Sequence, residues 1–251
     1  MISLSVVIIT NNEALNIERC LKSVLPVSND IIVVDSGSTD ATLDICRRYP
    51  VKVIEKKWEG YAAQKNFGNS LAVNPYILSI DADEELSPEL QEEIKLLSEP
   101  LADIYEMPFR INFCGKWLSF THWNPRKHVR IFRKEIPWNK DAVHEDLIIP
   151  KLAKKSALAG VINHYTTHSL KQYINKNDYY ATLAAEKMKA AGKRPSFVKL
   201  YLSPSWRFLH SFILKLGFLD GYYGFVIARE TARCAFLKYY RLKKRLANPA
   251  I

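Results

Sequence analysis

Two carboxylates one residue apart follow a short apolar run in the N-terminal half of the chain. Asp81 and Asp83 come directly after residues 76–80, which begin behind Pro75. The run does not alternate between apolar and polar residues, so it predicts a strand buried on both faces, as in a parallel sheet. Paired carboxylates at a strand end suit Mg²⁺ or Mn²⁺, which leaves coordination positions for diphosphate oxygens. The competing interpretation is an acidic loop before a helix, because residues 87–89 are a good helix start.

Polar residues also end two earlier strand-like runs. A β-branched run ends at Thr10, which is followed by Asn12 and Glu13, and a second apolar run ends at Asp35. Strand and helix patterns alternate through residues 1–100, which predicts a parallel sheet with right-handed crossovers and gathers these residues at one edge. Neither G-x-G-x-x-G nor a Walker loop follows the first run. A nucleotide bound here must therefore have its phosphates held by a metal and side chains.

Composition describes a globular protein with a basic surface. The chain has 251 residues, 48% of them hydrophobic, and a formal net charge of +10. This charge suits phosphorylated substrates or anionic lipid, and no nucleic-acid-binding motif accompanies it, so nucleic acid is not an expected partner. We see neither a signal peptide nor a membrane span, and we expect a cytoplasmic protein. The four cysteines are scattered, which favours a reducing compartment; they are Cys20, Cys46, Cys114 and Cys234.

The sequence is predicted to divide into a nucleotide-binding domain, residues 1–168, and a helical extension, residues 169–251. Helical patterns cover residues 170–191 and 220–245, with a proline-interrupted region between them. Seven Lys or Arg residues between 229 and 245 face one acidic residue, Glu230. A basic amphipathic helix of this kind can lie on an anionic membrane surface or contact another partner. The alternative is a helix that packs in the core and ends in a basic tail.

Several motifs together carry a resemblance to a known family. The residues concerned are 6–13, 33–40 and 81–84, with further matches at 64–66, 143–145 and 217–221. In these motifs the chain resembles the inverting family 2 glycosyltransferases, and most of all the bacterial lipopolysaccharide core beta-glucosyltransferase group. The resemblance extends from residue 1 to about 245 and is most specific in the N-terminal third. One departure is Asn11, where many relatives carry a tyrosine that can stack on uracil.

The resemblance implies a fold and a set of roles. The fold is GT-A, an α/β, Rossmann-like and mostly parallel sheet flanked by helices, here with a helical C-terminal extension. Metal coordination falls to Asp83, Asp81 and His164, although a lone histidine is more often simply hydrogen-bonded. The residues implied to bind the nucleotide-sugar are Thr10, Asn12, Glu13, Asp35, Ser38, Lys65, Asp81, Ala82 and Asp83.

The catalytic base is implied to lie in residues 144–146. Glu145 is favoured because it matches the Val-His-Glu pattern, and Asp146 is its rival; both could instead be an exposed acidic pair in a loop. Three arginines flank a strand pattern, and they either neutralise a diphosphate or phosphorylated acceptor or form a solvated face; they are Arg126, Arg130 and Arg133.

The resulting hypothesis is a metal-dependent inverting glycosyltransferase. It would move a sugar from a nucleotide-sugar, with UDP-hexose expected, to a cell-envelope glycan or lipid-linked glycan such as lipopolysaccharide core, at the cytoplasmic face of the inner membrane. One alternative transfers sugar to a polyprenyl phosphate, which needs no strong base and so tolerates loss of Glu145 and Asp146. Another is a non-catalytic nucleotide-sugar or glycan-binding module. The sequence specifies neither the sugar, the linkage nor the oligomeric state.

Overall fold

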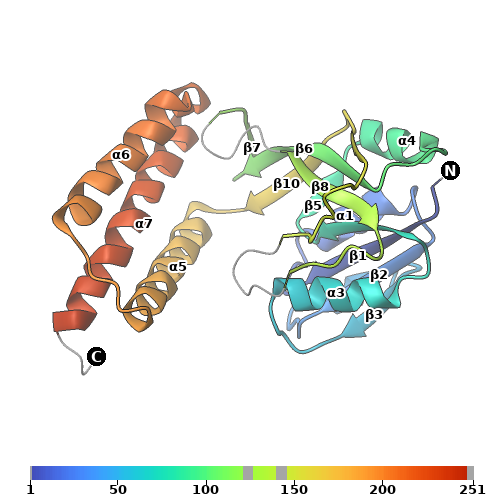
Figure 1. Cartoon of the computed structure of the whole chain (residues 1–251), viewed down its shortest axis with the longest axis horizontal. Helices are drawn as coiled ribbons and strands as arrows, with labels where there is room; N and C mark the ends of the chain where they lie inside the picture. The colour runs from blue at the N-terminus through green and yellow to red at the C-terminus, as the bar shows by residue number, and fades with distance from the viewer. Residues whose placement is uncertain (1, 121–126, 140–145, 248–251) are drawn as a thin grey trace. The chain divides into compact units, whose positions relative to one another are not determined.

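The computed structural model describes residues 2–120, 127–139 and 146–247, and the chain forms two compact units. The first contains residues 1–110 and 126–165, and the second contains residues 111–125 and 166–251 (Figure 1). The division predicted from the sequence, residues 1–168 and 169–251, remains a prediction.

Four parallel strands form one half of the sheet, in the order β3-β2-β1-β4. Their bounds are β1 (Leu4–Thr10), β2 (Asp30–Asp35), β3 (Lys52–Glu55) and β4 (Tyr76–Asp81). In this register Thr10 lies opposite Asp35, and Ile9 lies opposite Asp81. The carboxyl ends of β1, β2 and β4 therefore meet at one edge of the sheet, as the sequence predicts.

The described part of the sheet continues beyond β4 with mostly antiparallel strands. They are β5 (Glu84–Leu86), β6 (Ile104–Phe113), β7 (Lys116–Leu118), β8 (Lys127–Arg133), β9 (Lys155–Ala157) and β10 (Ile162–Thr167). Two of these pairings matter for the site. β8 runs antiparallel to β4, and β10 runs antiparallel to β5 with His164 opposite Glu84. Strands from the middle of the chain thus return to the edge where β4 ends.

Helices cover both faces of the parallel strands, which explains why those strands lack alternation. On one face Val6 and Ile8 pack against α1 and α4, and on the other Val7 and Ile9 pack against α3. The glycine of α3 that faces the sheet, Gly68, permits a close approach, since a Cβ there would lie 2.3 Å from Val7 Cγ1. The helices are α1 (Ile17–Val24), α2 (Thr42–Cys46), α3 (Tyr61–Leu71) and α4 (Pro88–Leu96).

The second unit is built from helices around a small core of Phe113, Tyr173 and Ile227. Its helices are α5 (Leu170–Ala190), η1 (Val198–Leu202), α6 (Ser203–Leu209), η2 (His210–Leu214), η3 (Gly217–Asp220) and α7 (Tyr222–Ala247). Asp220 ties the helices to the segment after β7 by accepting hydrogen bonds from the backbone N–H groups of Ser119 and Phe120. None of the helices in the described residues is both long and apolar enough to cross a bilayer.

Candidate functional site

A buried ionic cluster occupies the carboxyl end of β4. Lys65 Nζ lies 3.2 Å from Asp81 Oδ1, and Arg130 Nη2 lies 3.4 Å from Asp81 Oδ2. The same guanidinium pairs with Glu84, which is only 1% exposed. Burial alone would raise the pKa of the Asp81 carboxyl, but Lys65 and Arg130 together hold this pKa well below its usual range. Asp81 is therefore an ionised carboxylate already neutralised by two side-chain cations.

The pKa of Glu84 is shifted in the opposite direction from that of Asp81. Burial raises the pKa of its carboxyl, and the neighbouring Asp81 carboxylate adds to that effect. Its Oε2 accepts a hydrogen bond from the backbone N–H of Asp81 at 3.0 Å, so the side chain also fixes the backbone at the end of β4. Glu84 acts as an internal anchor between β4, β5 and Arg130.

Asp83 and His164 form a second, more open pair. His164 Nε2 lies 3.1 Å from Asp83 Oδ2, and both side chains are about a quarter exposed. The pairing of β10 with β5 brings them together, although they are 81 residues apart in the chain. Burial opposes the imidazolium, but the hydrogen bond and charge of Asp83 prevail and raise the pKa of His164. A carboxylate oxygen and an imidazole nitrogen are donors that Mn²⁺ and related divalent cations accept.

The loops after β1 and β2 hold each other. Asn12, at a positive φ of 55°, accepts a hydrogen bond from the backbone N–H of Thr39 at 2.8 Å and donates its own N–H to Ser38. Asp35 is fully buried, and its Oδ1 accepts the N–H groups of Gly37 and Ser38 at 2.8 Å each. The loops beside the strand ends are thus held in one arrangement by their own polar side chains.

The remaining residues implied to bind the donor lie at the same edge. Thr10 is buried, and its hydroxyl has no hydrogen-bond partner among the described residues, as a group that awaits a ligand would. Glu13 is half-buried and accepts a hydrogen bond from Asn16 Nδ2 at 2.7 Å. Ala82 is buried between the two aspartates, so only its backbone is available to a ligand.

Three consecutive residues of α3 connect the strand ends to the segment around Trp138. Gln64 Nε2 donates to Ser36 in the loop after β2 at 2.9 Å. Lys65, 1% exposed, reaches Asp81 and lies 4.7 Å from the centre of the Trp138 ring. Asn66 makes two hydrogen bonds with the backbone of Trp138, at 2.9 and 3.0 Å. The helix therefore positions a cation beside Asp81 from a firmly held support.

The two candidate bases are placed unequally. Glu145 lies outside the described residues, as does Arg126. Asp146 is exposed, and its backbone carbonyl accepts a hydrogen bond from Asn139 N–H at 2.8 Å. A β-bridge between Trp138 and Leu147 holds this end of the segment next to the residue that contacts Lys65. Trp138 and Leu147, on either side of the two candidate bases in the sequence, are therefore paired beside Lys65 of the ionic cluster.

Two contributors went unrecognised in the sequence. Glu84 has no clear sequence signal, because its burial alternates with that of Ala82 and Leu86 only in the folded structure. Trp138 has no such signal either, because a single aromatic residue after Pro137 is typical of a hydrophobic core. Of the three arginines, Arg130 is buried in the cluster, whereas Arg133 pairs with Asp103 at 2.6 Å on the surface.

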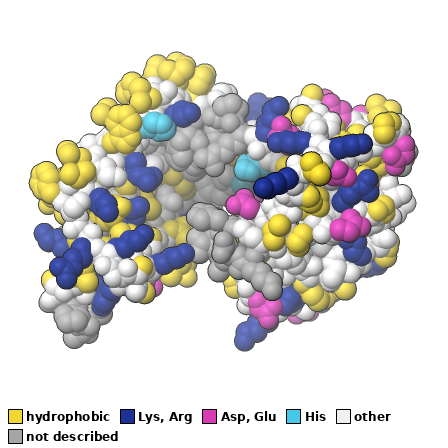
Figure 2. Space-filling view, in the orientation of Figure 1, with side chains coloured by type: hydrophobic (Ala, Val, Ile, Leu, Met, Phe, Trp, Pro, Cys, Tyr) yellow, Lys and Arg dark blue, Asp and Glu magenta, His cyan; other side chains and the backbone are white. Residues whose placement is uncertain are grey.

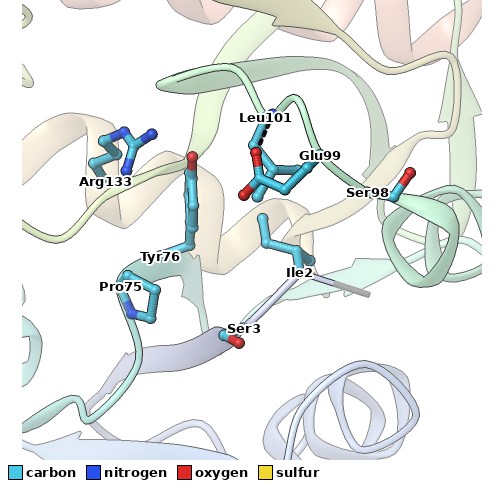
Figure 3. Close-up of a pocket in the computed structure, with 8 residues that line it drawn as sticks. All are labelled: Ile2, Ser3, Pro75, Tyr76, Ser98, Glu99, Leu101 and Arg133. Atoms are coloured by element: carbon cyan, nitrogen blue, oxygen red, sulfur yellow. Dashed lines mark hydrogen bonds between the residues drawn. The ribbon is translucent and has the colours of Figure 1, made fainter.

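A cavity of about 240 Å³ lies at the opposite edge of the sheet (Figure 3). Its lining includes Ile2 and Ser3 before β1 and Pro75 and Tyr76 at the start of β4. A strand rises about 3.3 Å per residue, so the length of β1 puts this cavity about 20 Å from Thr10. It is separate from the polar cluster at the carboxyl ends.

Arg130→Met should destabilise the protein by about 3–5 kcal/mol, because it leaves Glu84 buried without its cation. Urea denaturation of both proteins measures this change in the free energy of unfolding. The matched control is Arg133→Met, which removes an exposed ion pair and should cost less than about 1 kcal/mol. Equal costs for the two variants would contradict the anchoring role of Arg130.

Comparisons with known proteins agree with this arrangement. The family described as Glycosyl transferase family 2 matches residues 5–158. The lipopolysaccharide core biosynthesis glycosyltransferase LpsC of Rhizobium meliloti is 32% identical, over 98% of this chain and 94% of that protein. An uncharacterized glycosyltransferase of Rickettsia typhi is 33% identical, over 97% of this chain and 87% of that protein. 

The fold has a counterpart among solved structures. A crystal structure of S. aureus TarS aligns with a TM-score of 0.50 at 17% identity, covering 99% of this chain and 92% of that one. This likeness and the observed mixed sheet flanked by helices confirm the expected GT-A fold. With the family match and relatives that span nearly the whole chain, the protein belongs to glycosyl transferase family 2 and is a glycosyltransferase.

Proposed function

We propose that the protein transfers a hexose, with inversion, from a UDP-sugar to a glycan of the cell envelope such as lipopolysaccharide core. The observation that carries this proposal is the convergence at one sheet edge of acidic, cationic and imidazole side chains from five strands (β2, β4, β5, β8 and β10) and from α3. The unpartnered Thr10 hydroxyl, the Asp35 loop and the ionised Asp81 suit a nucleoside, whose hydroxyls and base edge need both donors and acceptors. The relative LpsC is named for lipopolysaccharide core biosynthesis, which supports the choice of acceptor.

Asp83 and His164 are the residues that would hold a divalent metal, Mg²⁺ or Mn²⁺. Their donor atoms lie 3.1 Å apart and are partly exposed, so an ion could bind between them and keep positions for diphosphate oxygens and water. Such a metal would stabilise the negative charge on the departing diphosphate. Asp81 is less suited to this role than the sequence implies, because Lys65 and Arg130 already neutralise it. We assign Asp81 to the ribose side of the donor.

Inversion requires a single displacement. A carboxylate takes the proton of the acceptor hydroxyl, the acceptor oxygen attacks the anomeric carbon from the face opposite the diphosphate, and the bond to the diphosphate oxygen breaks. We assign the base to Glu145, with Asp146 as the alternative. We assign Lys65 to the base or diphosphate side of the donor, next to Asp81, and the hydrogen bonds of its neighbour Asn66 with Trp138 support this part of α3.

The proposed acceptor is lipid-linked, so the working location is the cytoplasmic face of the inner membrane, with an anionic membrane surface as a further partner. The basic charge of +10 accords with both.

A panel of nucleotide-sugars tests the donor. We expect UDP-hexoses to be hydrolysed slowly, and transferred faster when an envelope glycolipid fraction is added, both with Mn²⁺ or Mg²⁺ present. Chromatography of released nucleotide measures the first, and mass spectrometry of the glycolipid measures the second. A preference for GDP- or CMP-sugars would contradict the proposed donor, and full activity in excess chelator would contradict the metal.

A further inference from the structure

The continuous helical run of the second unit, η1 with α6 and η2, has two apolar faces. On the inner face Phe208 and Phe212 pack with Phe225 of α7 at ring-centroid distances of 6.0 and 5.9 Å. A second face, offset around the run from the first, carries five large exposed apolar residues, which we call the outer stripe: Val198, Leu202, Trp206, Leu209 and Ile213. A surface helix normally carries polar residues outside its packed face, so a second apolar face indicates a further contact.

The outer stripe is exposed along its whole length. Its members recur at spacings of three or four residues and are 47–58% exposed. Figure 2 shows hydrophobic side chains gathered along the left-hand edge of the view, over the helix labelled α6 in Figure 1. Phe197 and Leu214, at the two ends of the run, are also exposed, at 71% and 60%. Contiguous exposed apolar surface of this kind marks an interaction site.

The charges around the outer stripe select its partner. Residues 187–219 contain no Asp or Glu, Lys199 and Arg207 are exposed within the helical run, and Lys215 is exposed directly after it. Apolar and aromatic residues beside cations, with no anion among them, complement a bilayer whose surface lipids are anionic. A second protein surface would more often require charges of both signs for specificity.

The helix expected from the sequence to contact the membrane, α7, is largely packed within its own unit. In α7 the buried residues include Val226, Ile227 and Leu242. Four of its seven basic side chains make ion pairs: Arg229, Arg233, Arg241 and Arg245 with Glu230, Asp178 or Glu186. The helix that looked membrane-facing in the sequence is therefore the core helix of its unit.

We propose that the outer stripe inserts at the interface of an anionic membrane, with its flanking cations at the lipid headgroups. The proposed function explains why the enzyme would bind a membrane, and in that respect this inference rests on it. The binding of the outer stripe to lipid does not depend on which sugar or acceptor the enzyme uses. Binding is measured without donor or acceptor, so failure of one proposal is distinguishable from failure of the other.

Vesicle flotation of the full chain tests the docking. We expect binding to vesicles of phosphatidylglycerol and phosphatidylcholine, weakened by salt, and much weaker binding to phosphatidylcholine alone. Leu209→Glu/Ile213→Glu should weaken binding by about tenfold or more while donor hydrolysis is retained. The matched control is Leu152→Glu in the first unit, where a 96% exposed leucine should make no difference.

A second measurement remains decisive if the charged variant does not fold. Phosphatidylglycerol brominated in the acyl chains should quench the tryptophan fluorescence of the parent, and Trp206→Phe should remove most of that quenching while binding persists. No quenching in the parent would overturn the proposal. So would unchanged binding of a folded Leu209→Glu/Ile213→Glu variant. A dimer in analytical ultracentrifugation that this variant dissociates, without vesicle binding by the parent, would assign the stripe to a second copy of the chain instead.

Discussion

Asp83→Asn is expected to reduce sugar transfer roughly a thousandfold, because a metal acting as a Lewis acid supplies several kcal/mol of stabilisation to the leaving diphosphate. The Asp83 side chain comes from the turn between β4 and β5, lies 3.1 Å from His164 and is partly exposed, whereas the Asp81 carboxylate is already paired with two cations. Asparagine keeps the shape and removes the charge. The change should also weaken UDP binding when Mn²⁺ is present and have little effect on UDP binding in chelator, which titration calorimetry measures.

The control for this variant is Glu85→Gln, two residues further along the chain in β5. Glu85 accepts a hydrogen bond from the Tyr165 hydroxyl at 2.8 Å and stands outside the proposed metal pair. Its replacement should leave transfer within a few fold of the parent. The transfer rate of His164→Gln should lie between those of Asp83→Asn and Glu85→Gln, since the change removes one of the two protein ligands of the proposed metal. Transfer that is undiminished both in Asp83→Asn and in excess chelator would refute the metal assignment.

The parallel half of the sheet was predictable because its signal is local. The uninterrupted apolar run before Asp81 could only be a strand covered on both faces, and the helices on both sides of β4 account for it. The meeting of Thr10, Asp35 and Asp81 followed from the topology alone, since parallel strands end at the same edge.

The cluster itself was not predictable, since its partners come from distant parts of the chain. Glu84 is 46 residues from Arg130, and Asp83 is 81 residues from His164. No local pattern encodes the pairing of β10 with β5, so only the family resemblance placed His164 with Asp83 and Asp81. The choice among three arginines was equally open, because burial of Arg130 depends on where β8 joins the sheet.

The proline-interrupted region is more continuously helical than its sequence pattern indicates. Pro204 lies at the start of α6, directly after the π-helical turn η1, where its missing N–H does not interrupt an established α-helical ladder. The helical run therefore continues through it to Leu214. A sequence pattern that ends helices at proline breaks this run in two and hides the periodicity of its outer face.

The catalytic base gives the other large expected effect. Glu145→Gln should lower turnover by about two to four orders of magnitude while UDP-sugar binding changes little, since a general base acts on the acceptor proton and not on the donor. The segment that carries it leaves from Asn139 and returns at Asp146, and both ends are held beside Trp138, which contacts Lys65. Turnover with saturating donor and acceptor measures the loss, and calorimetry with a UDP-sugar measures binding.

Asp146→Asn is the matched comparison, because it makes the same change one residue along. The Asp146 side chain is exposed, and its backbone carbonyl accepts a hydrogen bond from Asn139 N–H. We therefore expect turnover to fall by less than about tenfold, which is smaller than the loss of a general base. A large loss in Asp146→Asn with near-normal Glu145→Gln would move the base by one residue. If neither variant loses more than a few fold, the nucleophile needs no strong base. An acceptor that is already an anion, such as a polyprenyl phosphate, would then replace a glycan hydroxyl in the reaction.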